Sequence, residues 1–107
     1  MSRIIYNKLI RDKIPEIIQK DGKKYEVVVL QDSEFDEALR NKLIEESQEV
    51  IKADDETLLA ELADLQEIIL ALMSFHGIEQ EEFETVRLQR LQTRGGFEKK
   101  LKLLWTD

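Results

Sequence analysis

Two pairs of acidic residues near the middle of the chain have the spacing of metal ligands carried on helices. Glu46 and Glu49 are three residues apart, and Glu61 and Asp64 repeat that spacing further along. Residues three apart on an α-helix share a face about one turn from each other, so each pair presents two carboxylates together. Two adjacent antiparallel helices could then bring these four oxygen-donor side chains to one place.

The same acids fall on the apolar side of the helices that would carry them. Glu46 lies between Leu43 and Val50 in the inward-facing series, and Glu61 and Asp64 continue into the apolar stripe of the second helix. Carboxylates gathered in a partly buried site repel one another and are costly to desolvate unless cations neutralise them. An all-oxygen ligand set suits Mg²⁺ or Mn²⁺ and not Zn²⁺. Both pairs together therefore indicate a divalent-metal site, although either pair alone is weak in a chain with 23 acidic residues.

A helical hairpin is the element expected to position these acids. Asp32 or Ser33 can cap a first helix that ends near Ala53, and residues 54–57 form a turn before a second helix closed by Gly77. Apolar residues recur along both helices at spacings of three, four or seven, as amphipathic helices require. The recurring residues are Phe35, Leu39, Leu43 and Val50 in the first helix, and Leu58, Leu62, Leu65, Ile69 and Leu72 in the second.

Shorter elements flank the hairpin. Pro15 suits the first turn of a short helix over residues 15–20, and a third helix is expected over residues 79–94, ending at Gly95 and Gly96. Residues 25–30 form the only β-rich run, short enough for an edge strand or an extended arm. The expected fold class is mainly all-α, an antiparallel helical hairpin or bundle with a short N-terminal extended or β segment. Residues 1–107 are expected to form a single domain.

Charge is distributed unevenly along the chain. Residues 1–24 carry a net charge of +4, residues 25–84 carry −15 and residues 85–107 carry +4, for a formal total of −7. Binding of a nucleic acid polymer requires a cationic surface, so an acidic centre argues against it. The pattern suits a multivalent cation with a phosphate-bearing ligand beside it. From charge alone, a solvated acidic surface neutralised by the basic ends is the alternative.

The composition also sets the expected class of protein. The chain has no cysteine, which excludes disulfides and thiolate metal sites. Neither a secretory leader nor a membrane-length apolar run is recognisable, so a cytoplasmic protein that does not bind membranes is expected. A single domain of 107 residues buries a modest fraction of its surface, and this favours oligomerisation.

Several segments resemble one known family. Residues 42–49, KLIEESQE, followed by residues 61–65, ELADL, resemble the E-E-x-x-E and E-x-x-D signature of the all-α nucleotide pyrophosphohydrolases, which include MazG-like enzymes. Residues 6–15, YNKLIRDKIP, and 94–97, RGGF, resemble a small branch described as phosphoribosyl-ATP pyrophosphohydrolase-like. The resemblance covers most of the chain, and its single domain is expected to be MazG-like.

The resemblance implies a Mg²⁺-dependent hydrolase that cleaves between the α and β phosphates of a nucleoside triphosphate. The products would be a nucleoside monophosphate and pyrophosphate, as in the removal of non-standard nucleotides. Carried over position by position, the metal ligands would be Glu46, Glu49, Glu61 and Asp64. Glu45 matches the leading acid of the motif and could orient a ligand or help activate water, so Glu45, Glu46 and Glu49 are the catalytic candidates.

The basic ends supply candidates for contacts with substrate phosphates, which keep negative charge that the metal does not cancel. These candidates are Lys8, Arg11, Lys13 and Arg94, together with Lys99 and Lys100. The hydrophobic tail and the 25–30 run are available for exchange between subunits, so a homodimer with intertwined subunits is expected.

Two other functions stay open from the sequence. One is hydrolysis of phosphoribosyl-ATP itself, and the other is a non-catalytic helical regulator that binds a nucleotide or a protein. Base and sugar preference depend on a few side chains of the pocket and not on these motifs.

Overall fold

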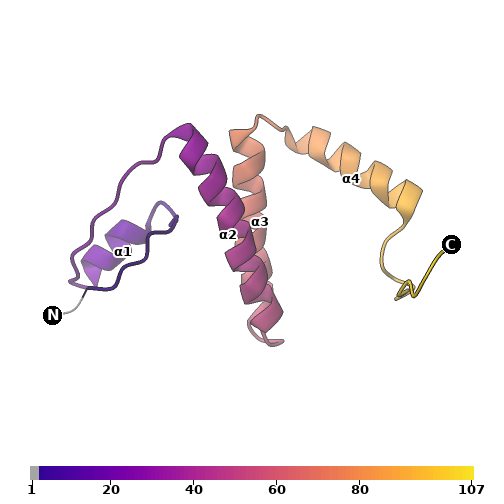
Figure 1. Ribbon diagram of the computed structural model, residues 1–107. Coiled ribbons are helices and arrows are strands. Elements are labelled where there is room, and N and C mark those ends of the chain that lie inside the picture. The colour runs from indigo at the N-terminus through magenta and orange to yellow at the C-terminus, as the bar shows by residue number, and fades with distance from the viewer. Residues whose placement is uncertain (1–2) are drawn as a thin grey trace.

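The computed structural model describes residues 3–107 and is built from α-helices (Figure 1). The helices of this range are α1 (Ile14–Lys20), α2 (Asp32–Lys52), α3 (Leu58–Phe75) and α4 (Gln80–Arg94). Helices α2 and α3 lie side by side as an antiparallel hairpin, with α1 on one side and α4 on the other (Figure 1). The expected mainly α-helical fold with a central hairpin is therefore confirmed.

Local hydrogen bonds fix the start of α2 and the turn between α2 and α3. Helix α2 is capped one residue earlier than expected, by Gln31, whose backbone N–H donates to the Glu34 carboxylate at 3.3 Å. At the turn before α3, Asp54 Oδ1 accepts from the backbone N–H groups of Glu56 at 3.0 Å and Thr57 at 2.9 Å. These bonds, led by the one from Thr57, lower the pKa of Asp54. The turn therefore fixes how α3 returns along α2.

The core of the hairpin is small. Among residues 3–107, the buried hydrophobic side chains are Leu39 of α2 and Ile68 and Met73 of α3, at 3%, 8% and 6% exposure. Phe35 and Phe75 meet edge to face at the open end, with ring centroids 5.3 Å apart. Other positions of the expected stripe, Leu58 and Leu62 among them, stay more than a third exposed because α3 packs against one helix only.

A polar contact joins the two helices beside the Phe35–Phe75 pair. His76 Nε2 and Asp36 Oδ1 lie 2.8 Å apart, and Arg40 Nε donates to the same carboxylate oxygen at 3.1 Å. The hydrogen bond from His76 is the main cause of a lowered pKa at Asp36, while partial burial opposes it. His76 thus ties the end of α3 to α2.

Residues 25–30 have no regular secondary structure and run as an open, extended connection into α2 (Figure 1), and no strand occurs in residues 3–107. The expectation of a β-strand is wrong, although that of an extended arm holds. A strand needs a neighbouring strand for its backbone hydrogen bonds, and the sequence has no second β-rich run to supply one. Val29 is consequently 98% exposed.

A glycine turn sets the direction in which the chain leaves the hairpin. Gly77 has φ of +67°, a left-handed conformation that glycine adopts without steric cost. Its N–H donates to Ser74 O at 3.2 Å, and the N–H of Ile78 donates to Met73 O at 2.8 Å. This pair of bonds is a Schellman motif, which ends α3 and directs α4 away from the hairpin (Figure 1).

The result is an elongated molecule. Its principal extents are 59 × 34 × 28 Å and its radius of gyration is 18.4 Å, whereas a compact chain of this length has a radius of about 13 Å. None of the described helices combines the length and apolar character needed to cross a bilayer.

Candidate metal centre

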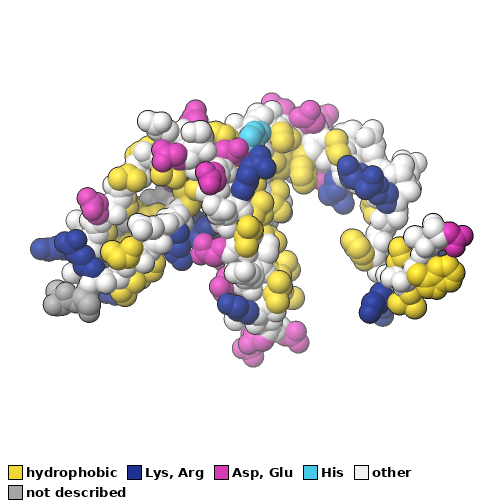
Figure 2. Space-filling model, in the orientation of Figure 1, with side chains coloured by type: hydrophobic (Ala, Val, Ile, Leu, Met, Phe, Trp, Pro, Cys, Tyr) yellow, Lys and Arg dark blue, Asp and Glu magenta, His cyan; other side chains and the backbone are white. Residues whose placement is uncertain are grey.

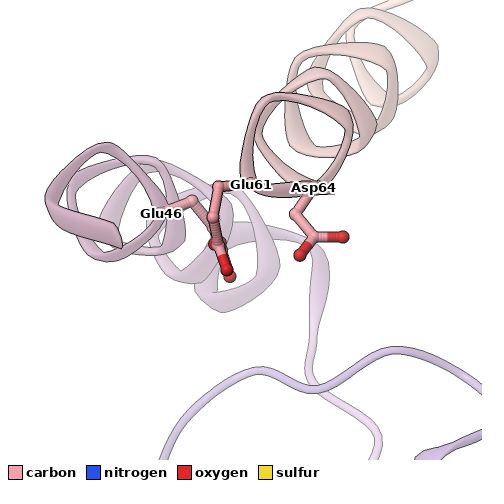
Figure 3. A group of neighbouring side chains, drawn as sticks. All are labelled: Glu46, Glu61 and Asp64. Carbon is pink, nitrogen blue, oxygen red and sulfur yellow. The ribbon is translucent and has the colours of Figure 1, made fainter. Parts of the chain in front are cut away.

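Three of the four predicted ligands come together across the hairpin. One carboxylate oxygen each from Glu46 of α2 and from Glu61 and Asp64 of α3 lie within 4.8 Å of one another. Figure 3 shows the three carboxyl groups on one side of the helix pair, with Glu46 and Glu61 nearly superposed in this view. All three residues are half-buried. The i, i+3 spacing on α3 and the antiparallel packing therefore produce the expected juxtaposition.

The electrostatics of the group are those of carboxylates held close together. Partial burial is the largest cause of a raised pKa at Glu46. Lys42 acts in the opposite direction, and the charges of Asp64 and Glu61 raise the pKa further. Holding a charged Glu46 in this position therefore costs free energy, which a bound cation would recover.

The N-terminal segment already supplies two cations to this site. Arg11 Nη1 donates to Asp64 Oδ1 at 3.1 Å, and Lys8 Nζ donates to Glu45 Oε1 at 3.1 Å. These pairs join residues 53 and 37 positions apart in the sequence, so they fold the segment across the acidic face of the hairpin. All four side chains remain at least one third exposed, so each pair alone contributes little stability.

Glu45 belongs to the margin of the site and not to the group of three. Its Oε1 accepts from both Lys8 and Lys42, the latter at 3.2 Å. Burial tends to raise the pKa of Glu45, but the hydrogen bonds from the two lysines outweigh it and the net shift is downward. Glu45 is therefore held ionised.

The structure does not bring every predicted site residue to this place. Glu49 is exposed and is not one of the three acids whose oxygens converge. Lys13 is the N-cap residue of α1, and neither it nor Arg94 forms an ion pair with any residue in the range 3–107. Arg94 ends α4, which points away from the hairpin (Figure 1).

The site also includes Lys42, which the sequence analysis does not name as a site residue. Lys42 lies three residues before Glu45 on α2, and its side chain is only 15% exposed. The i, i+3 spacing of Lys42 and Glu45 was the available signal. A half-buried lysine at the margin lowers the cost of holding several carboxylates together.

Comparison with protein-family models, curated proteins and solved structures finds no match to the chain. Any function must therefore be argued from the site itself.

Proposed function

We propose that the chain is a Mg²⁺-dependent nucleotide pyrophosphohydrolase, which converts a nucleoside triphosphate to a nucleoside monophosphate and pyrophosphate. The observation that carries the proposal is the convergence of Glu46, Glu61 and Asp64 from two helices, with oxygens within 4.8 Å. The motif resemblance of residues 42–49 and 61–65 supplies the reaction class. Substrates of the house-cleaning kind, such as deaminated or oxidised nucleotides, belong to this proposal.

The donor set fits the proposed ion. Three carboxylates supply oxygen ligands only, and Mg²⁺ is usually held by a few carboxylates with water and substrate phosphate completing an octahedron. Glu46, Glu61 and Asp64 would hold it, and Glu49, one turn from Glu46 on α2, is a fourth candidate that needs a side-chain rotation. Mn²⁺ is expected to substitute, because it accepts the same ligands.

When bound, the ion would neutralise phosphate charge and lower the pKa of a nearby water. The water oxygen would attack the α-phosphorus, the bond from that phosphorus to the α–β bridging oxygen would break, and pyrophosphate would leave. Glu45, whose carboxylate accepts hydrogen bonds from Lys8 and Lys42, would orient that water or accept its proton. Lys8 and Arg11 would exchange their carboxylate partners for phosphate oxygens, which arginine can bind in a bidentate way.

The test is pyrophosphate release by the purified protein from standard, deaminated and oxidised nucleoside triphosphates and from phosphoribosyl-ATP, with and without Mg²⁺. Release that requires Mg²⁺ supports the proposal, and its rank order identifies the substrate class. A preference for phosphoribosyl-ATP far above all triphosphates would support the alternative of phosphoribosyl-ATP hydrolysis instead. Binding of nucleotide without any product would support a regulator.

A pair of variants ties activity to the site. Asp64→Asn removes a charged ligand and should lower turnover by about 100-fold or more. Glu67→Gln changes an exposed acid one turn further along α3 and should leave turnover within about twofold. Equal activities in the two variants would refute the assignment of the site.

A further inference from the structure

The N-terminal segment carries an aromatic side chain to the edge of the candidate metal centre. The ion pairs of Lys8 with Glu45 and of Arg11 with Asp64 hold this segment across the acidic face of the hairpin. Figure 2 shows Lys and Arg side chains between the N-terminal part of the chain and the hairpin, beside acidic side chains of the hairpin. Tyr6 lies two residues before Lys8, so its ring is held close to the same face.

A cation–π contact fixes the ring of Tyr6 relative to the site. Lys8 Nζ lies 5.7 Å from the centroid of the Tyr6 ring and 3.1 Å from Glu45 Oε1. An ammonium group within about 6 Å of an aromatic centroid is attracted by the electrons of the ring face. One lysine side chain therefore contacts both the acidic margin of the site and an aromatic face.

The backbone between these two residues has an uncommon conformation. Asn7 has φ of +46°, in the left-handed region that asparagine adopts more readily than most non-glycine residues. The chain then bends at Lys8. Uncommon backbone conformations cluster at ligand sites, where the surrounding contacts hold them in place. Asn7 therefore belongs to a local arrangement that keeps the side chains of Tyr6 and Lys8 together.

The aromatic side chains carried by the helices lie away from the acids. Phe75 is about 16 Å along α3 from Asp64, at about 1.5 Å per residue, and it faces Phe35 with ring centroids 5.3 Å apart. Phe83 lines the apolar groove between the hairpin and the start of α4. Tyr6, in contrast, is 64% exposed and contacts a residue at the margin of the site, so its ring is open to a ligand held there.

We infer that the Tyr6 ring is the surface on which the base of the nucleotide stacks, and this step rests on the proposed function. Lys8 would pair with a phosphate oxygen, and in a nucleotide one sugar separates the base from the α-phosphate. A phosphate-binding lysine with an exposed ring beside it therefore matches the two ends of one substrate molecule. Stacking of a base on an aromatic side chain is a recognised source of affinity for nucleotides.

This mode of recognition defines a substrate class. Stacking tolerates different bases because every base has a π-face, and it does not read the exocyclic groups at the edge of the base. Deaminated and oxidised purine nucleotides should therefore bind about as well as standard ones. Inorganic polyphosphates have no base, so they should bind less tightly than nucleotides with the same number of phosphates.

The first test compares two ligands of the full chain by isothermal titration calorimetry with Mg²⁺. One is α,β-methylene-ATP, in which a CH₂ group replaces the bridging oxygen of the bond proposed to break, and the other is inorganic triphosphate. Tyr6→Ala should weaken binding of the nucleotide analogue about tenfold, because it removes the stacking surface. The same variant should bind inorganic triphosphate within about twofold of wild type.

Two further variants control this comparison. Tyr6→Phe keeps the ring and removes only the hydroxyl group, so it should bind both ligands within about twofold of wild type. Tyr25→Ala removes the other tyrosine of the chain, which is 45% exposed and lies outside the site, and it should also bind both ligands as wild type does. A loss of affinity confined to Tyr6→Ala and to the nucleotide analogue identifies the ring as the base-binding surface.

The second test observes the ring directly by nuclear magnetic resonance of protein with labelled tyrosine rings. The chain has two tyrosines, so Tyr25→Phe assigns both sets of ring signals. The ring current of a stacked base should shift the Tyr6 signals when α,β-methylene-ATP is added with Mg²⁺. Inorganic triphosphate should shift them much less, and the Tyr25 signals should stay in place with either ligand.

Several outcomes would overturn the inference. Equal loss of affinity for both ligands in Tyr6→Ala would mean that the ring only positions Lys8. Unchanged affinity for both ligands, or wild type that binds inorganic triphosphate as tightly as the nucleotide analogue, would place no base on Tyr6.

These results are distinguishable from failure of the proposed function. Magnesium-dependent hydrolysis together with unchanged nucleotide affinity in Tyr6→Ala would keep the hydrolase and reject the role of Tyr6. Nucleotide binding that depends on Tyr6, without any product from a cleavable triphosphate, would keep the base-binding surface and reject the hydrolase.

Discussion

Replacing Glu46 with glutamine should stabilise the metal-free protein and weaken its stabilisation by Mg²⁺. In the absence of metal, Glu46 faces Glu61 and Asp64 with oxygens within 4.8 Å. At that separation one pair of like charges repels by about 0.9 kcal/mol in a water-like dielectric and about 3.5 kcal/mol at an effective dielectric of 20. The site is half-buried, and Lys42 offsets part of the repulsion. The net gain from Glu46→Gln is therefore on the order of 1 kcal/mol.

The same substitution removes the charge of a proposed ligand, so the effect of Mg²⁺ should reverse the order of stability. At a concentration one hundred times its dissociation constant, a ligand stabilises the folded state by about 2.7 kcal/mol. Wild type should gain about that much and overtake Glu46→Gln, whose gain should be less than about 1 kcal/mol at the same concentration. Urea unfolding at one fixed protein concentration, with Mg²⁺ or with EDTA, measures both differences.

Glu49→Gln is the matched control, because Glu49 lies one turn away on α2 and is exposed. It should leave metal-free stability nearly unchanged. Its response to Mg²⁺ also reports whether this residue rotates in as a fourth ligand. Destabilisation of the metal-free protein by Glu46→Gln, with the full Mg²⁺ response kept, would refute the assignment of Glu46 to the metal site.

Three other substitutions test the N-terminal cation, the hairpin core and the contact between Asp36 and His76. Arg11→Gln removes the cation that pairs with Asp64, so a metal ion should no longer compete with Arg11 for this carboxylate. Mn²⁺ affinity without nucleotide, measured by electron paramagnetic resonance, should rise up to about fivefold, while triphosphate affinity should fall. An unchanged Mn²⁺ affinity would argue against competition between Arg11 and the metal. Leu39→Ala empties the best-buried position, at 3% exposure, and should cost about 2–4 kcal/mol by urea unfolding, against less than about 0.5 kcal/mol for Ile51→Ala at 81% exposure. The pKa of Asp36 is lowered in the folded protein. The stability that its carboxylate contributes is therefore fully present above the unfolded-state pKa of about 3.8 and is lost as the pH falls through the lower pKa of the folded state. Wild type should therefore lose stability more steeply than Asp36→Asn between pH 5 and pH 3, and parallel curves would contradict this.

The hairpin and most of its acidic site could be predicted because local rules decide them. Leu39 and the acids at 46, 61 and 64 lie at helical spacings, and the Asp54 turn stands between two periodic segments. Antiparallel packing of two helices then follows from the short connection. These features need no knowledge of distant parts of the chain.

The remaining features depend on contacts that periodicity does not encode. Lys8 and Arg11 reach acids 37 and 53 residues away, and nothing in their spacing specifies those partners. The β-rich run at residues 25–30 has strand propensity without a strand to pair with, so tertiary context overrides it. Glu49 matches the motif, yet it is exposed and lies outside the group of three, whereas Glu61 and Asp64 at the same spacing both belong to it. Which member of an i, i+3 pair faces the other helix depends on how the two helices pack, and the spacing does not specify that.

The most direct test of the proposed hydrolysis is to identify the products formed from a nucleoside triphosphate by ³¹P nuclear magnetic resonance, with Mg²⁺ and with EDTA. Equal amounts of nucleoside monophosphate and pyrophosphate should form only with Mg²⁺, and neither product should form in Asp64→Asn. Orthophosphate and a nucleoside diphosphate, or no product from any triphosphate by folded protein, would contradict it.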